Sequence, residues 1–423
     1  MNVYDCLEKR GFIAGATNPH LRKALLQPIS FYLGFDPTAD SLHLGHLVGI
    51  MVMAWMKKFG HKTHALVGGA TGRIGDPSGK SVERPFLEDA IITSNVQAIH
   101  KFLEKIFSRA AGEEKVVFLN NNDWLSQFSF IDFLRDVGKH FRMSTMLAKE
   151  SVRLRLESEE GMSFTEFTYQ MLQAYDFYYL SKHHGVTLQL GGTDQWGNIT
   201  AGIELGRRLS APPLYGLTFP LLTRSDGKKF GKSEGGAVWL SAERLSPYQF
   251  YQYLMGIPDA DIPRMMALLT FMEMEEIQEI EHRMSLSDYI PNSAQKRLAE
   301  EVTRFVHGDD GLKIAQQVTA TASPGSSASL DAKSLEVIAK DMPHEEIASS
   351  EILGQRFVDV ASARGWVSSK SEAMRLIKNK GAYLNNIAID DPFFIFDAGQ
   401  LIDKTFFLIS IGKKKKILVR LRF

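Results

Sequence analysis

Residues 29–47 read ISFYLGFDPTADSLHLGHL, and this stretch decides the fold. The apolar run that ends at Phe35 predicts a short buried strand, and Asp36-Pro37 ends it. The apolar segment 43–59 contains small residues and predicts a helix that begins at His43-Leu44-Gly45-His46. A strand that leads directly into a helix is the opening of a βαβ unit.

The same alternation continues downstream. Further strands are expected over 62–69, 115–119 and 187–190, and helices over 85–110, 163–182 and 194–208. Alternating strands and helices indicate an α/β fold, a parallel sheet with helices on both faces. Ligands of such sheets bind at the carboxyl ends of the strands, and most of the motifs described below fall at such ends.

After Ser246-Pro247 the composition changes, and the pattern is helical with no clear strand until about residue 322. The small polar run 323–329 is typical of a linker, and a compact α+β module is expected from Gln355 to Phe423.

The composition excludes several classes of protein. The 423 residues are 44% hydrophobic and 23% charged, which is ordinary for a globular chain of roughly three domains. The single cysteine, Cys6, excludes a disulfide framework and a cysteine-ligated zinc cluster. The longest apolar run, 47–56, is too short to span a bilayer, and the first ten residues resemble neither a secretion signal nor a transit peptide. We therefore expect no membrane segment and a cytoplasmic protein.

The net charge of zero is a sum of unequal parts. Residues 355–423 contain 13 Lys and Arg against 6 Asp and Glu, a net charge of +7 that the rest of the chain balances. A basic tail on an acidic body favours contact with a polyanion. The alternative is an ordinary solvated surface.

The start of the helix at His43 is suited to binding a nucleotide. Free N–H groups and the helix dipole attract phosphate there, and Gly45 has no side chain to obstruct a flat ring. A base resting on Gly45 would place its phosphates near His43 and Thr38. The alternatives are two histidines that cap the helix or bind a metal, but the sequence offers no nearby cysteine and no third ligand.

Two glycine-rich loops resemble phosphate loops but fail on spacing. A P-loop requires glycine five residues before Gly-Lys-Ser, and those positions are Ile74 and Asp226. The loop over 222–236 holds Lys228, Lys229 and Lys232, which suit a transient polyphosphate charge. A plain exposed loop is the alternative.

Residues 35–46 resemble the first signature of class I aminoacyl-tRNA synthetases, and residues 229–233 (KFGKS) resemble the second. Further segments resemble the bacterial and mitochondrial tyrosyl-tRNA synthetases: 69–72 (GATG), 75–80 (GDPSGK), 163–167 (SFTEF), 173–177 (QAYDF) and 189–199 (QLGGTDQWGNI). The match covers nearly the whole chain in order.

This resemblance implies an architecture. The first part is a Rossmann-like parallel-sheet catalytic domain, and a helical domain and a small α+β RNA-binding module follow it. The expected segments are the catalytic domain (1–222), a mobile signature loop and connection (223–246), a helical anticodon-binding domain (247–322), a linker (323–354) and the RNA-binding module (355–423).

The resemblance also implies the reaction. The enzyme is expected to activate L-tyrosine with ATP and transfer it to the 3′ end of tRNA(Tyr), as a homodimer. Mg²⁺ is expected to enter through the ATP phosphates, with no metal held by the protein and no tightly bound cofactor. No side chain is expected to act as nucleophile or base, because the tyrosine carboxylate itself attacks the α-phosphorus. The protein works by alignment and charge stabilisation.

The resemblance carries the tyrosine site over residue by residue. Tyr32 and Asp176 match positions that hydrogen-bond the phenol. The ammonium positions match Asp76, Tyr169 and Gln173, and the position near the carboxyl end matches Gln195. Tyr169, Gln173 and Asp176 are four and three residues apart, so they share one face of a helix. The alternative for this face is a polar surface stripe.

The nucleotide and catalytic sites are implied in the same way. The ATP positions are Gly34, Asp36, His43, Gly45, His46, Gly192, Asp194 and Lys232, and the catalytic positions are Thr38, His43, His46, Lys80, Arg84, Lys229 and Lys232. Two residues depart from the family pattern: Leu33 stands where many relatives have a cysteine that contacts ribose, and Gly49 replaces a larger residue.

Residues 368–385 resemble the RNA-binding module shared by a ribosomal protein and pseudouridine synthases. Arg375 and Lys378 share a helix face there and are the expected phosphate contacts. Two other functions stay open: an RNA-binding protein on an inactive synthetase scaffold, and a tryptophanyl-tRNA synthetase. The second normally lacks the C-terminal module and has no need of Tyr32 and Asp176 for a phenol.

Overall fold

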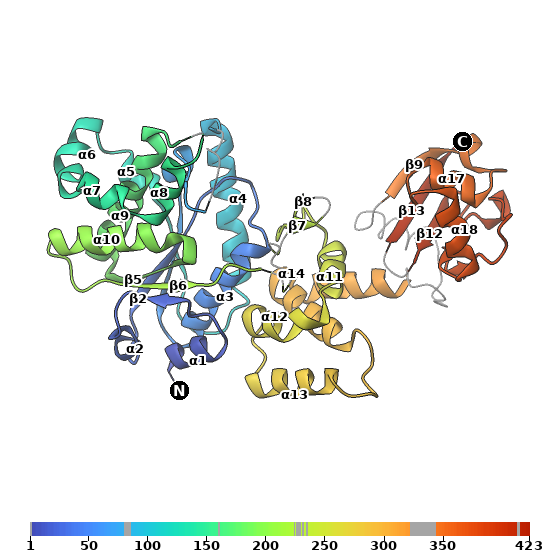
Figure 1. The fold of residues 1–423 in the computed structure, drawn as a ribbon, viewed down its shortest axis with the longest axis horizontal. Helices are drawn as coiled ribbons and strands as arrows, with labels where there is room; N and C mark the ends of the chain where they lie inside the picture. The colour runs from blue at the N-terminus through green and yellow to red at the C-terminus, as the bar shows by residue number, and fades with distance from the viewer. Residues whose placement is uncertain are drawn as a thin grey trace. The chain divides into compact units, whose positions relative to one another are not determined.

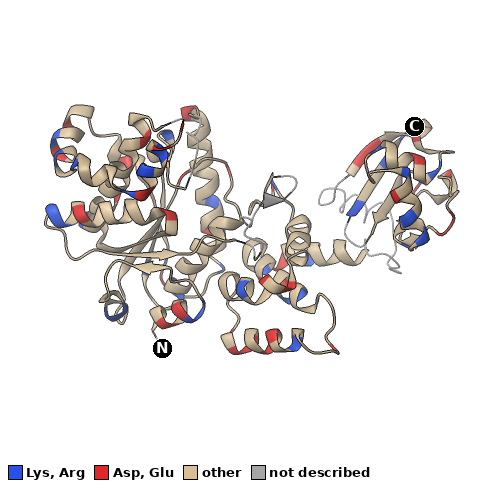
Figure 2. Cartoon of the chain, in the orientation of Figure 1, with Lys and Arg blue, Asp and Glu red and all other residues tan. Residues whose placement is uncertain are grey.

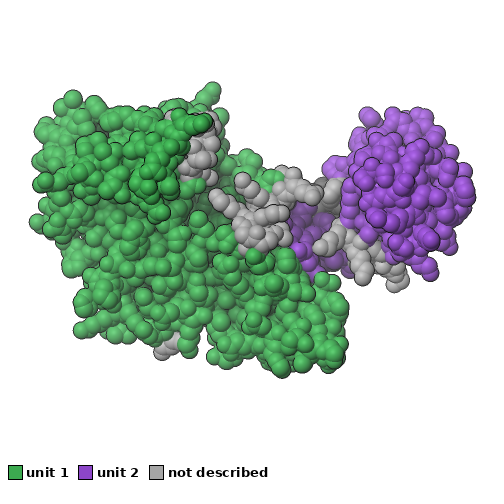
Figure 3. All heavy atoms as spheres, viewed as in Figure 1, with its two compact units in different colours: residues 1–244, 257–306 green, residues 245–256, 307–423 purple. Residues whose placement is uncertain are grey.

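The structure is a computed structural model that describes residues 2–79, 86–159, 161–223, 225, 230, 232–233, 236–321, 344–412 and 415–423, with the backbone alone at 232–233. The chain forms two compact units (Figures 1 and 3). The first unit contains residues 1–244 and 257–306, and the second contains residues 245–256 and 307–423.

The first unit is built on a six-stranded sheet of strand order β1-β6-β5-β2-β3-β4. The strands are β1 (Gly15–Ala16), β2 (Ser30–Phe35), β3 (Lys62–Val67), β4 (Val117–Asn120), β5 (Val186–Gly192) and β6 (Tyr215–Phe219). All neighbours pair in parallel except β1, which is antiparallel to β6 at the edge. The predicted parallel α/β sheet is confirmed, but neither the two-residue strand β1 nor β6 was predicted from the sequence.

The order of the strands locates the binding crevice. From β2 the chain continues to β3 and β4 on one side, and later returns to β5 and β6 on the other side. The order therefore reverses between β2 and β5. Ligands of open α/β sheets bind at such a reversal, outside the carboxyl ends of the strands.

Helices cover both faces of this sheet, as expected. On one face, α3 (Leu44–Lys58) is buried along its length, and its Gly49 lies against Leu33 of β2 and Phe219 of β6. On the other face, Tyr32 of β2 packs with Phe177 of α9 (Phe164–His184). Alternate residues of β2 therefore face opposite helices. Ser163 caps the start of α9, and Gly185 ends it with φ 65°, a left-handed conformation that favours glycine.

Figure 1 also shows the remaining elements of the first unit. They are α1 (Val3–Lys9), α2 (Leu21–Ala24), α4 (Asp89–Phe107), α5 (Asn122–Leu125), α6 (Phe130–Asp136), α7 (Met143–Leu147), α8 (Glu150–Leu156), α10 (Trp196–Arg208), α12 (Ile262–Leu269), α13 (Met274–Met284) and the hairpin of β7 (Lys232–Ser233) with β8 (Gly236–Ala237). Four short 3₁₀ turns join them: Thr71–Arg73, Gly138–His140, Thr193–Gln195 and Asp259–Asp261. The described residues of 247–321 contain helices and no strand, as the sequence predicts.

The second unit contains α11 (Pro247–Met255), the end of α14 (Ser293–Thr321) and the C-terminal module. The helix α14 is interrupted at Gly308, where φ is 79° and ψ is 178°. The module has a five-stranded sheet of order β11-β10-β12-β13-β9. Its elements are β9 (His344–Ala348), α16 (Ser349–Ile352), α17 (Phe357–Ala363), α18 (Lys370–Lys378), β10 (Ala382–Leu384), β11 (Ile387–Ala388), the 3₁₀ turn Ala398–Gln400, β12 (Phe406–Ile411) and β13 (Lys415–Arg422).

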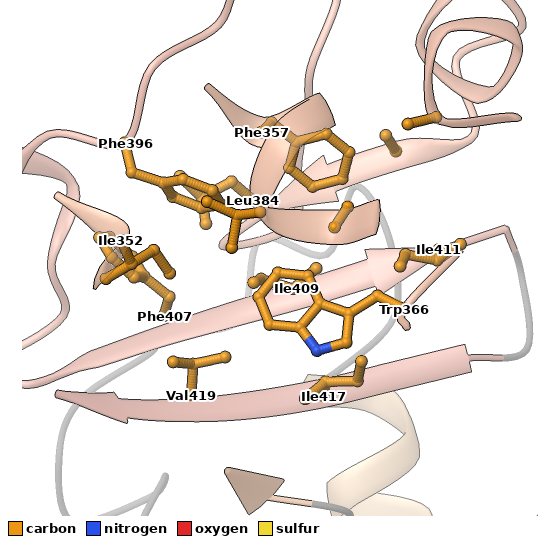
Figure 4. Packing of buried hydrophobic residues seen from close by; sticks show 14 of the residues in the cluster. Ile352, Phe357, Trp366, Leu384, Phe396, Phe407, Ile409, Ile411, Ile417 and Val419 are labelled. Carbon is orange, nitrogen blue, oxygen red and sulfur yellow. The ribbon is translucent and has the colours of Figure 1, made fainter. Parts of the chain in front are cut away.

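The C-terminal sheet has an apolar layer on each face. Phe407, Ile409 and Val419 point into the core between sheet and helices, where Trp366 and Phe396 meet them (Figure 4). Residues on the opposite face of β12 and β13 pack with α11 and α14: Phe406, Leu408 and Leu418 with Tyr248 and Val318. The α+β module expected from the sequence is thus observed. Its sheet includes β9, which lies within the segment expected as linker and pairs in parallel with β13.

Candidate active site

Polar residues from four parallel strands gather where those strands end. Asp36 follows β2, Thr71 lies in the turn after β3, Asn121 follows β4, and Gln195 lies in the turn after β5. Hydrogen bonds link these segments directly, as the next paragraphs describe. The edge expected from the strand-end rule is therefore a single polar site.

Two buried residues form the deep end of this site. Tyr32 on β2 is 1% exposed, and its hydroxyl has no hydrogen-bond partner among the described residues. Asp176 on α9 is 2% exposed. Burial, followed by the charge of Asp176, raises the pKa of Tyr32 well above its ordinary value, so the two side chains sense each other's charge. The sequence-derived pairing of these residues from separate elements is consistent with this arrangement.

The carboxylate of Asp176 is held by two side chains from the segment after β4. The indole Nε1 of Trp124 donates to Oδ1 at 2.8 Å, and the amide Nδ2 of Asn121 donates to Oδ2 at 3.0 Å. Burial raises the pKa of Asp176 to about 7, although these two hydrogen bonds favour its charged form and lower the pKa. No lysine or arginine among the described residues forms an ion pair with it. The carboxylate is therefore held in place by two neutral donors, and the described part of the chain places no cation beside it.

A hydrogen-bonded chain connects this deep end to the outer part of the site. Asn121 also donates to the hydroxyl of Thr71 at 2.9 Å, and Thr71 donates to Asp36 at 2.8 Å. The hydroxyl of Tyr169 donates to the other oxygen of Asp36 at 2.7 Å. Tyr169 and Asp36, expected at the ammonium and nucleotide positions respectively, are therefore direct partners.

A second network surrounds Asp76, which is buried. Its Oδ2 accepts from Gln195 Nε2 at 2.6 Å, and its Oδ1 accepts from the backbone N–H of Ser78 at 3.0 Å. Asn198 Nδ2 donates to Gln173 Oε1 at 2.9 Å and lies 3.4 Å from Asp76 Oδ1. In the described parts of the chain, Asp76 has no lysine or arginine partner. A buried carboxylate surrounded by neutral amides is suited to receive a cationic group.

The two histidines of the first signature cap α3. His43 Nδ1 accepts from the backbone N–H of Gly45 at 3.1 Å, and His46 Nδ1 accepts from the backbone N–H of His43 at 3.1 Å. Their rings pack 3.9 Å apart. The alternative interpretation of helix capping is thus confirmed as a structural role. The helix start still faces the polar edge, and among the described residues no cluster of three or more His, Cys, Asp or Glu is placed to hold a metal.

The other nucleotide candidates line the same edge. Thr38 and Gly34 are exposed, and Asp194 lies close to Gly79 and Gly192, where an added Cβ would meet its carboxylate at 3.3 and 2.6 Å. A Cβ on Gly45 would meet the ring of His43 at 2.9 Å. These glycines allow a close approach to the backbone.

Four expected cationic residues are not among the described side chains. Lys80, Arg84 and Lys229 lie outside the described residues, and Lys232 is described only by its backbone in β7. Their roles stay predictions.

The two departures from the family pattern are neighbours in space. A Cβ on Gly49 would come within 2.8 Å of both Leu33 Cδ2 and Phe219 Cζ. Leu33 therefore fills the volume that a larger residue at position 49 would take, and the two changes compensate each other.

The RNA-binding candidates lie in the second unit. Arg375 and Lys378 are both exposed in the last turn of α18, which carries basic residues (Figure 2). Exposed cations on one helix face are suited to phosphate contacts.

Sequence reasoning missed several site residues: Thr71, Ser78, Asn121, Trp124 and Asn198. The run Asn120-Asn121-Asn122-Asp123-Trp124 directly follows a strand, and the strand-end rule applied to it would have indicated this segment.

Comparison with known proteins gives a consistent result. The family model described as tRNA synthetases class I (W and Y) matches residues 24–322. The chain is 54% identical over 420 residues to a protein of Protochlamydia amoebophila named tyrosine–tRNA ligase, covering 99% of each chain. It is 48% identical to the chloroplastic/mitochondrial tyrosine–tRNA ligase of Arabidopsis thaliana, covering 99% of this chain and 84% of that one.

A solved structure agrees as well. The C-terminally truncated mitochondrial tyrosyl-tRNA synthetase of Aspergillus nidulans superimposes with a TM-score of 0.67 at 31% identity, covering 74% of this chain and 92% of that one. The resemblance found in the sequence motifs is confirmed.

Proposed function

The chain belongs to the class I tRNA synthetases for tryptophan and tyrosine, and from this premise we propose that its site joins tyrosine to tRNA(Tyr) with ATP. Relatives that are 42–54% identical over nearly the full chain are named tyrosine–tRNA ligases. The reaction makes tyrosyl-adenylate and pyrophosphate, and then tyrosyl-tRNA and AMP.

One observation carries the choice of tyrosine. The hydroxyl of Tyr32 is buried without a partner among the described residues, beside the buried carboxylate of Asp176. A substrate phenol would donate to Asp176 and accept from Tyr32, whereas phenylalanine would leave the Tyr32 hydroxyl unpaired and would offer Asp176 no further donor. An unpaired buried polar group costs about 1–3 kcal/mol. Strong rejection of phenylalanine is already known as a property of this enzyme family, and it follows from the same logic.

The ammonium end is assigned to Asp76. Its carboxylate has amide neighbours and no lysine or arginine partner among the described residues, so a substrate ammonium would complete the charge balance. Gln173 and Gln195 lie in the hydrogen-bond network around it, and the charge of Asp76 also acts on Tyr169, whose hydroxyl donates to Asp36. The tyrosine carboxylate is then directed toward the nucleotide edge.

The nucleotide is assigned to the edge formed by Gly34, Asp36, Gly45, Gly192 and Asp194. Its phosphates would lie at the start of α3, near His43, His46 and Thr38, where the helix dipole favours anions. Lys80, Arg84, Lys229 and Lys232 are proposed to neutralise the leaving pyrophosphate. ATP would enter with Mg²⁺ on its phosphates. The protein contributes alignment and charge, and the substrate carboxylate is the nucleophile.

A homodimer is supported by an apolar surface on the first unit. Helices α6 to α9 share one buried cluster, yet they expose the large side chains Phe130, Ile131, Met143, Leu154 and Phe164. Exposed apolar side chains of this size are typical of surfaces that another protein covers.

The segment roles expected from the sequence complete the proposal. The helical segment is assigned to the anticodon, and the C-terminal module binds tRNA phosphates through Arg375 and Lys378. Among the described residues, no helix is long and apolar enough to cross a membrane. We place the enzyme in the cytoplasm, as its composition suggests.

The experiment that tests the function is amino-acid-dependent exchange of pyrophosphate into ATP. Exchange with tyrosine, and neither with tryptophan nor phenylalanine at equal concentration, is expected. Exchange with tryptophan alone would indicate the related synthetase. Folded, pure protein without any exchange would favour an RNA-binding protein on an inactive scaffold.

A further inference from the structure

The segment that carries the second signature is attached at both ends to named residues of the first unit. On the C-terminal side of this segment, the backbone N–H of Leu44 donates to the carbonyl of Val238 at 2.8 Å. The backbone N–H of Leu240 donates to the carbonyl of Leu42 at 2.9 Å. Arg244 forms an ion pair with Asp40. The C-terminal end of the segment is thus bound directly to residues of the first signature.

The N-terminal end of the segment contacts a different element, the start of α12. The two carboxylate oxygens of Asp261 both accept from Ser225, Oδ1 from its backbone N–H at 2.9 Å and Oδ2 from its hydroxyl at 3.3 Å. Arg264 donates to the carbonyl of Thr223 at 3.1 Å. The backbone N–H of Phe230 donates to the carbonyl of Leu222 at 3.1 Å, so the residues on both sides of 226–229 are fixed.

Asp261 is an unusual residue to find in such a contact. It is 3% exposed, and it precedes α12 in the position where an aspartate commonly caps a helix. Its side chain makes no capping hydrogen bond to α12. Burying a carboxylate is costly unless its oxygens are satisfied, and here Ser225 satisfies both. Asp261 therefore holds the segment that contains Ser225, and it does not cap α12.

The helix that carries Asp261 is itself firmly held. Met265, Met266 and Leu269 of α12 are buried, and α12 packs against α3, which begins at the catalytic histidines. At the other end of α12, the buried guanidinium of Arg10 donates to the carbonyls of Ala267, Thr270 and Met272 at 2.8–2.9 Å. Asp261 is therefore a fixed point relative to the first signature.

We propose that Asp261 is a positioning residue for adenylate formation. By holding Ser225, it sets where the chain enters the segment that contains Lys229 and Lys232, so that these lysines reach the pyrophosphate. This proposal rests on the proposed function of those lysines. Asp261 itself touches no substrate.

The first test is pyrophosphate exchange with the full-length Asp261→Ala enzyme. Two hydrogen bonds are lost, so kcat is expected to fall about tenfold while the KM for tyrosine stays within about twofold. Asp261→Asn keeps an acceptor for the Ser225 N–H and should restore most of the rate. The matched control is Asp259→Ala, two residues away on the same turn but exposed and bonded to Gln295, which should leave kcat unchanged.

A variant of Ser225 tests whether Asp261 acts on the signature segment or only stabilises the fold. Ser225→Ala removes the hydroxyl without emptying the buried site of Asp261, and it should lower kcat about threefold with an unchanged melting temperature. If Asp261→Ala lowers the melting temperature and Ser225→Ala has no effect on kcat, the proposal is wrong.

A double-mutant cycle identifies the route of the effect. In a background that carries both Lys229→Ala and Lys232→Ala, Asp261→Ala should lower kcat by less than about twofold, because the groups it positions have been removed. A full tenfold loss in both backgrounds would overturn the role of Asp261. The single Lys229→Ala variant tests the proposed function separately: if its kcat is unchanged, the role of Lys229 is refuted whatever Asp261→Ala shows.

Discussion

Replacing Tyr32 by phenylalanine removes one oxygen atom and should change stability and specificity in opposite directions. In the protein without substrate, the hydroxyl of Tyr32 is buried and has no partner among the described residues. Removing it ends the desolvation cost of an unpaired polar group, which is about 1–3 kcal/mol. The ring keeps its contact with Phe177, 5.5 Å away, so little packing is lost. We expect the free energy of unfolding to rise by about 1 kcal/mol.

The same change should weaken the enzyme toward its own substrate. The hydrogen bond from Tyr32 to a neutral phenol contributes about 1 kcal/mol, which corresponds to about a fivefold lower kcat/KM for tyrosine. Phenylalanine makes no such bond and meets one unpaired group fewer in the variant. Its kcat/KM should rise or stay level, so the preference for tyrosine should fall at least about fivefold.

Two measurements check this prediction. Pyrophosphate exchange at a series of tyrosine and phenylalanine concentrations gives the two kcat/KM values, and urea unfolding of the substrate-free protein gives the stability. A suitable control is Tyr178→Phe, because Tyr178 lies on α9 outside the pocket and packs with Tyr175. A variant of Tyr32 that is less stable than the parent and equally selective would refute the reasoning, since the hydroxyl would then have a structural partner.

Four further predictions concern Asp176, its partner Asn121 and the C-terminal module. Burial raises the pKa of Asp176 to about 7, so this group loses its proton as the pH rises through 7 and becomes a stronger hydrogen-bond acceptor. The KM for tyrosine in exchange assays should therefore fall over this pH range, and Asp176→Asn should abolish the pH dependence. The same raised pKa means that this group lowers stability as pH rises from about 4 to about 7, since the unfolded chain loses the proton first; unfolding curves across that range should show a loss that is absent in Asp176→Asn. Asn121→Ala removes a donor to a carboxylate and should raise the KM for tyrosine about tenfold or more, with a smaller effect on the KM for ATP; equal effects on both would contradict the assignment. Deleting residues 355–423 should leave pyrophosphate exchange intact and make tRNA charging weak and strongly salt-sensitive; charging that is unaffected at every salt concentration would remove the module from the mechanism.

The sequence was sufficient for the framework of the site. The alternation of strands and helices predicts the parallel sheet, and the four- and three-residue spacing of Tyr169, Gln173 and Asp176 predicts a shared helix face, because both depend on local periodicity. Motif spacing also excluded a P-loop. These features are encoded within short stretches of the chain.

The support of the site is different, because it depends on contacts between distant segments. Asn121 and Trp124 lie more than fifty residues before Asp176, and nothing in their local pattern indicates that they hold its carboxylate. The exchange of volume between Leu33 and Gly49 becomes visible only when α3 is laid on β2. Asp261 reads as an ordinary helix start, and only the structure shows its carboxylate turned to Ser225.

The helix α9 also acts as a ruler for the amino acid. Tyr169 is proposed for the ammonium end and Asp176 for the phenol end, and seven residues of α-helix separate them by about 10 Å. Because the rise per residue of a helix is fixed, substitutions at either position change which atoms bind there and leave the distance between the two positions unchanged. Redesign of the site for a longer or shorter amino acid would therefore require one of these binding residues to be moved along α9 by a whole helical turn.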